Sequence, residues 1–250
     1  MATVGAAYCV YDACTLLEES VERIYPLVDK ILFLINFKPW RGAEIEGAPE
    51  ETYSLILSLP DPDNKFEIVS QYWADEKDQR NAGLVFLRSQ KIDWCLIVDD
   101  DEFYNRSEIQ HVFDTLDTAI HAAYLFSHQI YWKERGTIIE GLFGAFPSLV
   151  RTDGIVNFNE NRMILVSQGN TWFNITADDI VCHHLSYIRS DEDMQRKVNI
   201  FSHADDLSDD WFNRVWIHWY EDMMDLHPTT PTAFKRTVSA ENSPYKLEKI

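Results

Sequence analysis

The chain has 250 residues, a length that suits a single α/β domain with additional elements. Apolar residues make up 46% of it and aromatic residues 13%, which is ample for a core and argues against extended disorder. Asp and Glu outnumber Lys and Arg by 41 to 22, giving a formal net charge of −19 that repels phosphate backbones and anionic lipid surfaces. The charge therefore argues against nucleic acid as a partner. It favours a divalent cation if the protein binds a nucleotide diphosphate.

The first half of the chain alternates apolar runs with helical patterns, which is typical of a mainly parallel sheet with crossover helices. After the first run, Leu17, Val21 and Ile24 recur at helical spacing and predict the first crossover. A capping-box pattern at Ser107 opens the last helix of this half. The expected strands are 4–10, 30–36, 66–72 and 94–98, and a second crossover helix is expected at about 50–59.

The second half changes to strands separated by turns that contain Gly and Asn. Such strands can extend a parallel sheet in antiparallel orientation. Ser190, followed by an acidic first turn, predicts a helix to about residue 203, and the Trp-rich segment 209–226 is expected to form the last helix. The strands expected here are 119–132, 141–151, 163–166 and 180–187.

The four cysteines, Cys9, Cys14, Cys95 and Cys182, show no C-x-x-C or zinc-like spacing and are expected to be free thiols. The N-terminus has no basic region before a long apolar one, and the longest apolar run, 31–35, is too short to cross a bilayer. We therefore expect a cytoplasmic protein without a membrane span.

Four acidic residues, Asp99, Asp100, Asp101 and Glu102, directly follow the expected strand 94–98. Open parallel sheets bind ligands beyond the carboxyl ends of their strands. Four adjacent carboxylates also repel one another and raise each other's pKa, so their clustering is more easily explained if a cation binds there. The alternative is an acidic turn that caps the following helix.

The segment 97–103 resembles the D-x-D-E-F form of the D-x-D motif in GT-A glycosyltransferases, particularly family 2 and its relatives. The resemblance implies that Asp99 contacts the ribose of the donor or the metal. It further implies that Asp101 coordinates the metal that bridges the diphosphate, with Asp100 on the donor side. The implied cofactor is Mn²⁺ or Mg²⁺.

A second segment, 79–84, resembles the R-N-x-G-L helix start of the same family, with Asp75 before it. The resemblance implies that Arg80 and Asp75 lie near the nucleotide, and Tyr8 on the first strand is expected beside them. The chemistry agrees, because Arg80 can pair with a phosphate or a strand-end carboxylate and a helix N-terminus presents free N–H groups to anions. The alternative is a surface arginine on an amphipathic helix.

A third segment, 182–187, resembles the H-x-S-Y segment of these enzymes, in which a histidine completes the metal site. His184 matches that position, and neutral imidazole is a suitable ligand beside carboxylates for Mn²⁺. Because neighbouring strand residues point to opposite faces, His183 is expected to be structural. The alternative for His184 is a satisfied core histidine.

The catalytic base is less clearly indicated. An inverting transfer needs a carboxylate within hydrogen-bond reach of the acceptor hydroxyl. Glu140, in a stretch flanked by glycines, is the first candidate, followed by Asp179 and Asp178. Each can equally be a turn or surface acid, and an enzyme that retains configuration needs no such base.

The resemblance covers about residues 3–205 and departs from commoner members at 11–13, where Tyr-Asp-Ala replaces an Asn-Glu pair. It implies a nucleotide-sugar-binding α/β half, 1–117. The acceptor-side β segments and C-terminal helices, 118–250, would belong to the same domain.

The function predicted from these motifs is an inverting, metal-dependent glycosyltransferase. It would move a sugar from a nucleotide-sugar donor, a UDP-sugar first, to a hydroxyl of a carbohydrate or glycan-precursor acceptor. One alternative is a sugar-phosphate nucleotidyltransferase, although residues 6–9 lack the expected Gly-rich loop. The other is a non-catalytic carbohydrate-binding protein on the same fold.

Overall fold

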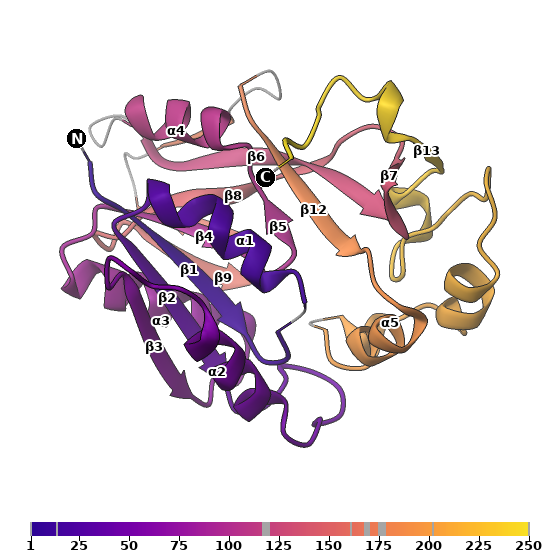
Figure 1. Cartoon of the computed structure of the whole chain (residues 1–250), viewed down its shortest axis with the longest axis horizontal. Coiled ribbons are helices and arrows are strands. Elements are labelled where there is room, and N and C mark those ends of the chain that lie inside the picture. Colours follow the sequence, from indigo (N-terminus) through magenta and orange to yellow (C-terminus); the bar gives the residue numbers. More distant parts are fainter. Residues whose placement is uncertain are drawn as a thin grey trace.

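The computed structural model describes residues 2–13, 15–116, 121–160, 162–167, 171–174, 179–201 and 203–249. Its first half is a parallel sheet with strand order β3-β2-β1-β4 (Figure 1). The prediction of this sheet is confirmed, and three of its strands begin and end at the expected residues. The elements are β1 (Val4–Val10), α1 (Leu17–Ile24), η1 (Tyr25–Leu27), β2 (Lys30–Asn36), α2 (Ala48–Ser58), β3 (Phe66–Gln71), α3 (Glu76–Ser89) and β4 (Trp94–Val98).

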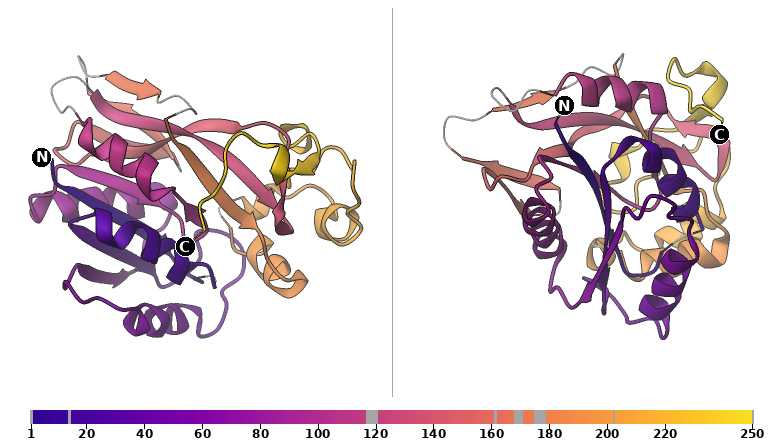
Figure 2. Two further views of the ribbon diagram at one scale, coloured as in Figure 1. Left: turned by 45° about the horizontal axis from the view of Figure 1, so that its top comes forward. Right: turned by 60° about the vertical axis from the view of Figure 1, so that its left-hand side comes forward.

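Helices cover both faces of this sheet, as the right-hand view of Figure 2 shows with α3 on one side and α1 and α2 on the other. Side chains alternate between the faces along each strand. Leu96 of β4 packs in the cluster that contains residues of α1, α2 and α4, whereas Ile97 packs in the cluster that contains residues of α3. Gly83 allows the close approach of α3, because a Cβ at this position would lie 2.9 Å from Leu34 Cδ1.

The strand β4 lies inside the sheet, between β1 and the antiparallel strand β8. Cys95 and Ile97 face the α3 side, and continuing the alternation by one step sends Asp99 to that side as well. The end of β4 thus delivers the acidic residues to the edge where the parallel strands finish.

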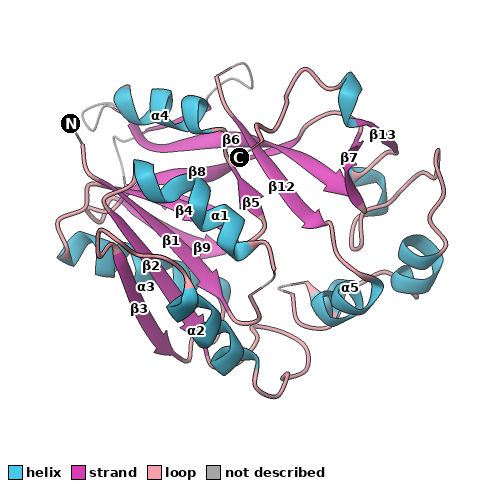
Figure 3. Ribbon diagram, viewed as in Figure 1, coloured by secondary structure: helices cyan, strands magenta, loops and turns pink. Residues whose placement is uncertain are grey.

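The second half extends the sheet, with β8 and β6 antiparallel to each other and β12 running parallel to β6 (Figure 3). The mixed α/β fold, with a mainly parallel sheet, flanking helices and an antiparallel extension, is the one that the sequence predicts. Its elements are β5 (Glu102–Phe103), α4 (Arg106–Asp114), β6 (His121–Trp132), β7 (Glu134–Ile139), β8 (Phe143–Arg151), β9 (Val156–Glu160), β10 (Met163–Val166), β11 (Thr171–Asn174), β12 (Val181–Tyr187), α5 (Asp191–Val198) and β13 (Thr237–Ser239).

The C-terminal region only partly follows the prediction. Helix α5 forms, but the helix expected at 209–226 is wrong, because only Phe212–Ile217 is helical, with π-type geometry. Trp211 and Trp216 turn inward instead and pack with Trp132 of β6. The backbone φ values of Asp210, Asp222 and Asp225 are 52°, 71° and 61°. These values lie in the left-handed region, so a right-handed helix cannot continue through these residues. Aromatic packing thus overrides the local helical pattern.

Within the described part of the chain, no helix combines the length and hydropathy needed to cross a bilayer. Cys9, Cys95 and Cys182 are free thiols, as expected, and Cys14 lies outside the described residues.

The imidazole of His227 is expected to make stability depend on pH. Its Nδ1 accepts a hydrogen bond from the Thr230 backbone N–H at 3.0 Å, and burial lowers its pKa to about 4. Between about pH 6.5 and pH 4 the unfolded chain therefore binds a proton that the folded chain does not, so stability falls as the pH falls through this range. From pH 7 to pH 5 we expect a loss of about 1 kcal/mol, allowing for partial exposure of the ring.

Urea unfolding at pH 7 and pH 5 measures this loss, and the His227→Asn variant is the matched control. Asn can accept the same N–H bond but does not titrate. The difference between the two pH values should be smaller in the variant by about 1 kcal/mol. An identical pH dependence in both proteins would show that His227 is not its source.

Candidate functional site

A cleft of about 990 Å³ opens beyond the carboxyl ends of β1 and β4. Residues 9–13, at and after the end of β1, and residues 99–101, which follow β4, line one side of it. The other side comes from the second half, through β12, α5 and residues 227–230. A cleft therefore lies at the end of β4, beside the acidic residues that follow this strand, and both halves of the chain build it.

Asp101 lies at the floor of this cleft and is almost fully buried. Its Oδ1 is 3.1 Å from His184 Nε2, and its Oδ2 accepts hydrogen bonds from Arg189 Nη2 at 3.0 Å and Lys197 Nζ at 2.7 Å. Burial alone would raise the pKa of Asp101, but Lys197, His184 and Arg189 together hold it well below its ordinary value. Asp101 is thus a carboxylate that stays ionised inside the protein.

Backbone pairing holds His184 beside Asp101. Strand β12 runs antiparallel to β5, with His184 opposite Glu102, and the Leu185 N–H donates to the Asp101 carbonyl at 2.8 Å. Asp101 and His184, 83 positions apart, are thereby brought together as the sequence predicts. His183 turns to the opposite side, where its Nδ1 is 3.0 Å from the Tyr131 hydroxyl.

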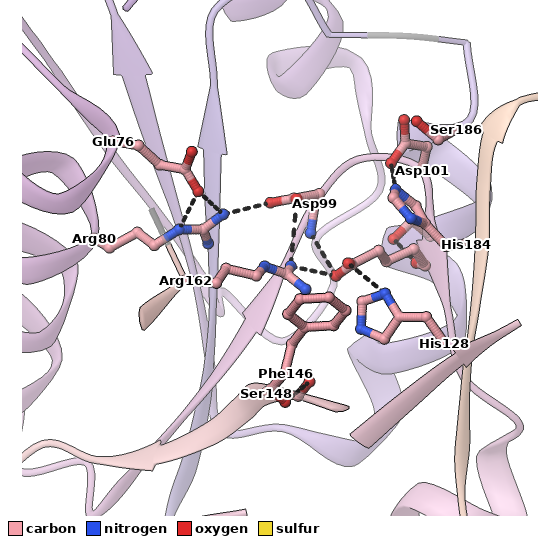
Figure 4. A network of polar contacts seen from close by, with 12 residues as sticks. Glu76, Arg80, Asp99, Asp101, His128, Phe146, Ser148, Arg162, His184 and Ser186 are labelled. Atoms are coloured by element: carbon pink, nitrogen blue, oxygen red, sulfur yellow. Dashed lines mark hydrogen bonds and ion pairs between the residues drawn. The ribbon is translucent and has the colours of Figure 1, made fainter. Parts of the chain in front are cut away.

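Asp99 faces two arginines on the α3 side of the sheet (Figure 4). Arg80 Nη2 donates to its Oδ1 at 3.1 Å, and Arg162 Nη2 lies 3.3 Å from its Oδ2. Arg80 also binds Glu76 Oε1 through Nε and Nη2, at 2.8 Å and 2.6 Å. Because Arg80 is only 2% exposed, the alternative of a surface arginine is wrong.

Arg162 was not indicated by the sequence. It lies between β9 and β10 and donates to Glu102 Oε2 at 2.6 Å. Its position depends on Asn81 of α3, whose side-chain amide both donates to the Phe158 carbonyl and accepts from the Phe158 N–H, each at 2.8 Å. These two bonds attach β9 to α3. A local sequence pattern could not indicate this contact, because it joins residues 77 positions apart.

The charges around the cleft differ from those of the whole chain. Six lining residues are Lys or Arg and seven are Asp or Glu, whereas acids outnumber bases nearly two to one overall. The carboxylates of the acidic cluster are thus largely balanced by the chain's own cations. A bound cation is therefore not needed to explain the clustering of these carboxylates. The cations that contact it are Arg80, Arg162, Arg189 and Lys197.

Three side chains form a group whose geometry is compatible with a metal ion: Glu102, His128 of β6, and His184. One ligand atom from each lies within 4.8 Å of the others. Burial raises the pKa of Glu102 and holds the pKa of His128 well below its ordinary value. The sequence prediction included His184 in a metal site but not the other two residues.

Two of the residues expected at the donor lie outside the cleft. Tyr8 is fully buried in the core, where its hydroxyl is 3.0 Å from Ser20 Oγ, because the alternation of β1 turns it toward α1. Asp75 is the N-cap of α3 and accepts from the Asp78 N–H at 3.0 Å. Neither residue is among those that line the cleft.

The candidate bases are not brought to the acidic cluster either. Glu140 is exposed and pairs with Arg236, which donates to both of its carboxylate oxygens. Asp179 is also exposed, and neither acid lines the cleft. Asp178 lies outside the described residues. The structure thus places Glu140 in an exposed ion pair outside the cleft.

No protein-family model matches the chain, and no curated protein is similar to it. Solved structures with a related fold include mannose-1-phosphate geranyltransferase from Thermus thermophilus, with 13% identity, 62% of this chain and 51% of that chain covered, and a TM-score of 0.36. Residues 1–349 of S. aureus TarS show 12% identity, coverage of 74% and 60%, and a TM-score of 0.44. A longer TarS structure shows 12% identity, coverage of 71% and 37%, and a TM-score of 0.38.

The chain thus spans between about a third and three fifths of the length of these structures. At such identities and TM-scores the likeness is distant and concerns the fold alone.

Proposed function

We propose that the protein is a glycosyltransferase that takes a sugar from a nucleotide-sugar donor bound in the cleft beyond β1 and β4. The observation that carries the proposal is the pairing of Asp101 with His184 at the cleft floor. A buried carboxylate and a partly exposed imidazole meet there, at the end of a parallel strand where α/β sheets bind ligands. The D-x-D-E-F and H-x-S-Y resemblances meet at the same place.

The pair fits a divalent cation. Two cis ligands of an octahedral ion, each about 2.1 Å from it, lie about 3.0 Å apart, and Asp101 Oδ1 and His184 Nε2 are separated by 3.1 Å. Asp101 and His184 would hold the ion, with Asp99 as a further proposed contact to the ion or the donor. When bound, such an ion supplies charge neutralisation for the departing diphosphate.

The chain's own cations are placed to hold the diphosphate. Lys197 Nζ bonds to Asp101 at 2.7 Å and Ser186 Oγ at 2.6 Å, which are two partners for its three N–H bonds. Arg189 and Arg162 also line the cleft. Because buried carboxylates hold these cations in place, the cations need little rearrangement when a phosphate binds. Their fixed positions would orient the diphosphate, and with it the donor, for in-line displacement.

The near balance of charge at the floor leads to a binding prediction. A cation alone would add positive charge beside Lys197 and Arg189, and a diphosphate alone would add negative charge beside Asp101 and Asp99. We therefore expect UDP and Mn²⁺ to bind cooperatively, with each raising the affinity of the other at least tenfold, or about 1.4 kcal/mol of coupling.

Calorimetric titration of UDP into the protein, with and without Mn²⁺, measures this coupling. A UDP affinity that does not change with Mn²⁺ would remove the metal from the proposal while leaving nucleotide binding in place. Failure to bind UDP, or any other nucleoside diphosphate, under either condition would contradict the proposed function itself.

A further inference from the structure

A second cavity, of about 870 Å³, lies on the face of strands β5 and β12 opposite to the cleft. Helix α1, strands β6 and β7 and residues 240–249 line it, and it shares no lining residue with the cleft. His184 of β12 faces the cleft. Phe103 of β5 turns to the other face, where Arg23 and Arg135, which line the cavity, lie 5.5 Å and 5.7 Å from the centre of its ring. The volume is typical of small-molecule sites.

The buried cation of this cavity, Arg23, has a donor without a partner. Its side chain is 4% exposed, and its Nη2 donates to Glu19 Oε1 at 3.2 Å and to the Glu248 carbonyl at 2.8 Å. Its Nε has no hydrogen-bond partner among the described residues. A guanidinium in a protein stays protonated and can only donate, and leaving a buried donor unpaired is costly. The missing partner of Arg23 is therefore a hydrogen-bond acceptor.

A second buried atom on the same face also lacks a partner within the described part of the chain. It is Nε2 of His183, a residue that is fully buried and lies opposite Phe103 in the β12–β5 pair. The other ring nitrogen of His183 is 3.0 Å from the hydroxyl of Tyr131, which lines the cavity. Two unpaired polar atoms thus lie on the face that the cavity covers.

The charges nearest to Arg23 favour an anionic acceptor. Glu19 binds both arginines, and Arg135 donates to both of its carboxylate oxygens. No other carboxylate of the described residues forms an ion pair with Arg23 or Arg135. Two guanidinium charges therefore share one carboxylate, which leaves an excess positive charge beside the unpaired Nε.

The remaining charges of the cavity lie farther out. The lining contains four acidic and four basic side chains, but Glu22, Glu241 and Glu248 are exposed, and water weakens their effect. Lys246 Nζ bonds to the carbonyl oxygens of residues 240 and 241, at 2.8 Å and 2.6 Å, rather than to a carboxylate. The balance of charge at Arg23 is thus set by its nearest partners.

We infer that this cavity is a second ligand site, which binds a small organic oxyanion, a carboxylate or a phosphomonoester, through Arg23 Nε and the excess charge shared with Arg135. Guanidinium groups bind both kinds of oxyanion well. A bare inorganic ion would fill only a small part of the volume, so the ligand carries an organic body. Tyr131, Tyr245 and Leu247 are the lining side chains with apolar surface to cover it. The inference goes beyond the proposed sugar transfer and does not depend on it.

Calorimetric titration of the full chain with phenyl phosphate and with benzoate tests this site, because the two probes share a ring and differ in the oxyanion. At least one of them should bind, and neutral benzyl alcohol should bind at least tenfold more weakly. Binding of phenyl phosphate alone would identify a phosphomonoester site, and binding of benzoate alone a carboxylate site. If neither binds at millimolar concentration, the inference is wrong.

Variants locate the binding. Arg23→Gln and Arg135→Gln each leave one guanidinium for one carboxylate, and each should weaken binding at least tenfold. Arg135 is 45% exposed, so its variant keeps the test decisive if Arg23→Gln does not fold. Arg236→Gln is the matched control, because Arg236 is equally exposed, also binds a glutamate and lines neither cavity. It should bind like the wild type. Wild-type affinity in a folded Arg23→Gln or Arg135→Gln variant would place the ligand elsewhere and overturn the inference.

A crystal structure with the tighter probe provides a test that needs no variant. We expect an oxyanion oxygen within hydrogen-bond distance of Arg23 Nε. A water molecule at that position, with the probe bound only in the cleft, would overturn the inference while leaving the proposed function untouched.

Discussion

Replacing Asp101 with Asn is expected to weaken Mn²⁺-dependent UDP binding about 100-fold or more. The carboxylate is the proposed ligand that shares the ion with His184, and about 3 kcal/mol of lost interaction corresponds to that factor. The same change removes the ionised partner of Lys197 and Arg189, whose side chains are only 23% and 11% exposed. We therefore also expect the variant to fold but to lose about 1–3 kcal/mol of stability.

The control for this experiment is Glu140→Gln. Glu140 is also an acid bound to an arginine, but it is exposed and outside the cleft. UDP affinity, Mn²⁺ dependence and stability should all match the wild type in this variant. A folded Asp101→Asn protein that binds UDP and Mn²⁺ normally would remove Asp101 from the site.

Arg80→Ala should lower the free energy of unfolding by about 3–5 kcal/mol, because it leaves Glu76 buried without its cation. Glu76 is 7% exposed at its side chain and receives two hydrogen bonds from Arg80. Donor binding should weaken as well, since Asp99 loses one of the two arginines that hold it. Urea unfolding and UDP titration measure the two effects separately.

Two further variants test whether the unpaired carboxylate of Glu76 causes the loss of stability. Arg88→Ala, at an exposed position on the same helix, should change stability by less than about 0.5 kcal/mol. Adding Glu76→Gln to Arg80→Ala removes the unpaired buried charge and should recover most of the lost stability. If the single Arg80→Ala variant is as stable as the wild type, the Arg80 to Glu76 contact contributes nothing and the assigned electrostatics are wrong.

The first half of the fold was predictable because three of its four parallel strands are short apolar runs. Strands β1, β2 and β4 are buried on both faces, so sequence and burial coincide. In the second half the strands β7 and β9 carry polar residues, and each makes a contact with a segment distant in the sequence. Strand β7 pairs with β13, and Asn81 of α3 binds Phe158 of β9. Local pattern therefore indicated the existence of an antiparallel extension but missed several of its members.

The sequence likewise indicated some residues of the candidate site and missed others. Asp101 and His184 lie in short motifs, so the sequence indicated both. Arg162 and His128 reach the site through pairings over long sequence distances, and no local signal marks them. Tyr8 was wrongly expected near the nucleotide. Side chains alternate along β1, and Tyr8 points to the same face as Ala6 and Val10, which is the face covered by α1.

The net charge of the chain did not indicate the balance of charges within the site. A charge of −19 favoured a divalent cation beside any bound diphosphate, yet four of the chain's own cations also contact the acidic cluster: Arg80, Arg162, Arg189 and Lys197. The positions of single charges within the cleft outweigh the sum over the chain, because nearby buried partners interact far more strongly than distant exposed ones.

The proposed reaction is the transfer of a sugar from a nucleotide-sugar donor that binds in this cleft. The most direct measurement is incubation of the protein with a panel of UDP- and other nucleotide sugars in the presence of Mn²⁺, with analysis of the products. We predict slow, metal-dependent release of free sugar and nucleoside diphosphate from at least one donor, abolished by Asp101→Asn and retained in Glu140→Gln. In a parallel incubation with a nucleoside triphosphate and a sugar phosphate, release of pyrophosphate would indicate nucleotidyl transfer instead. Metal-independent binding of a sugar without any donor cleavage would contradict the account and point to a carbohydrate-binding protein.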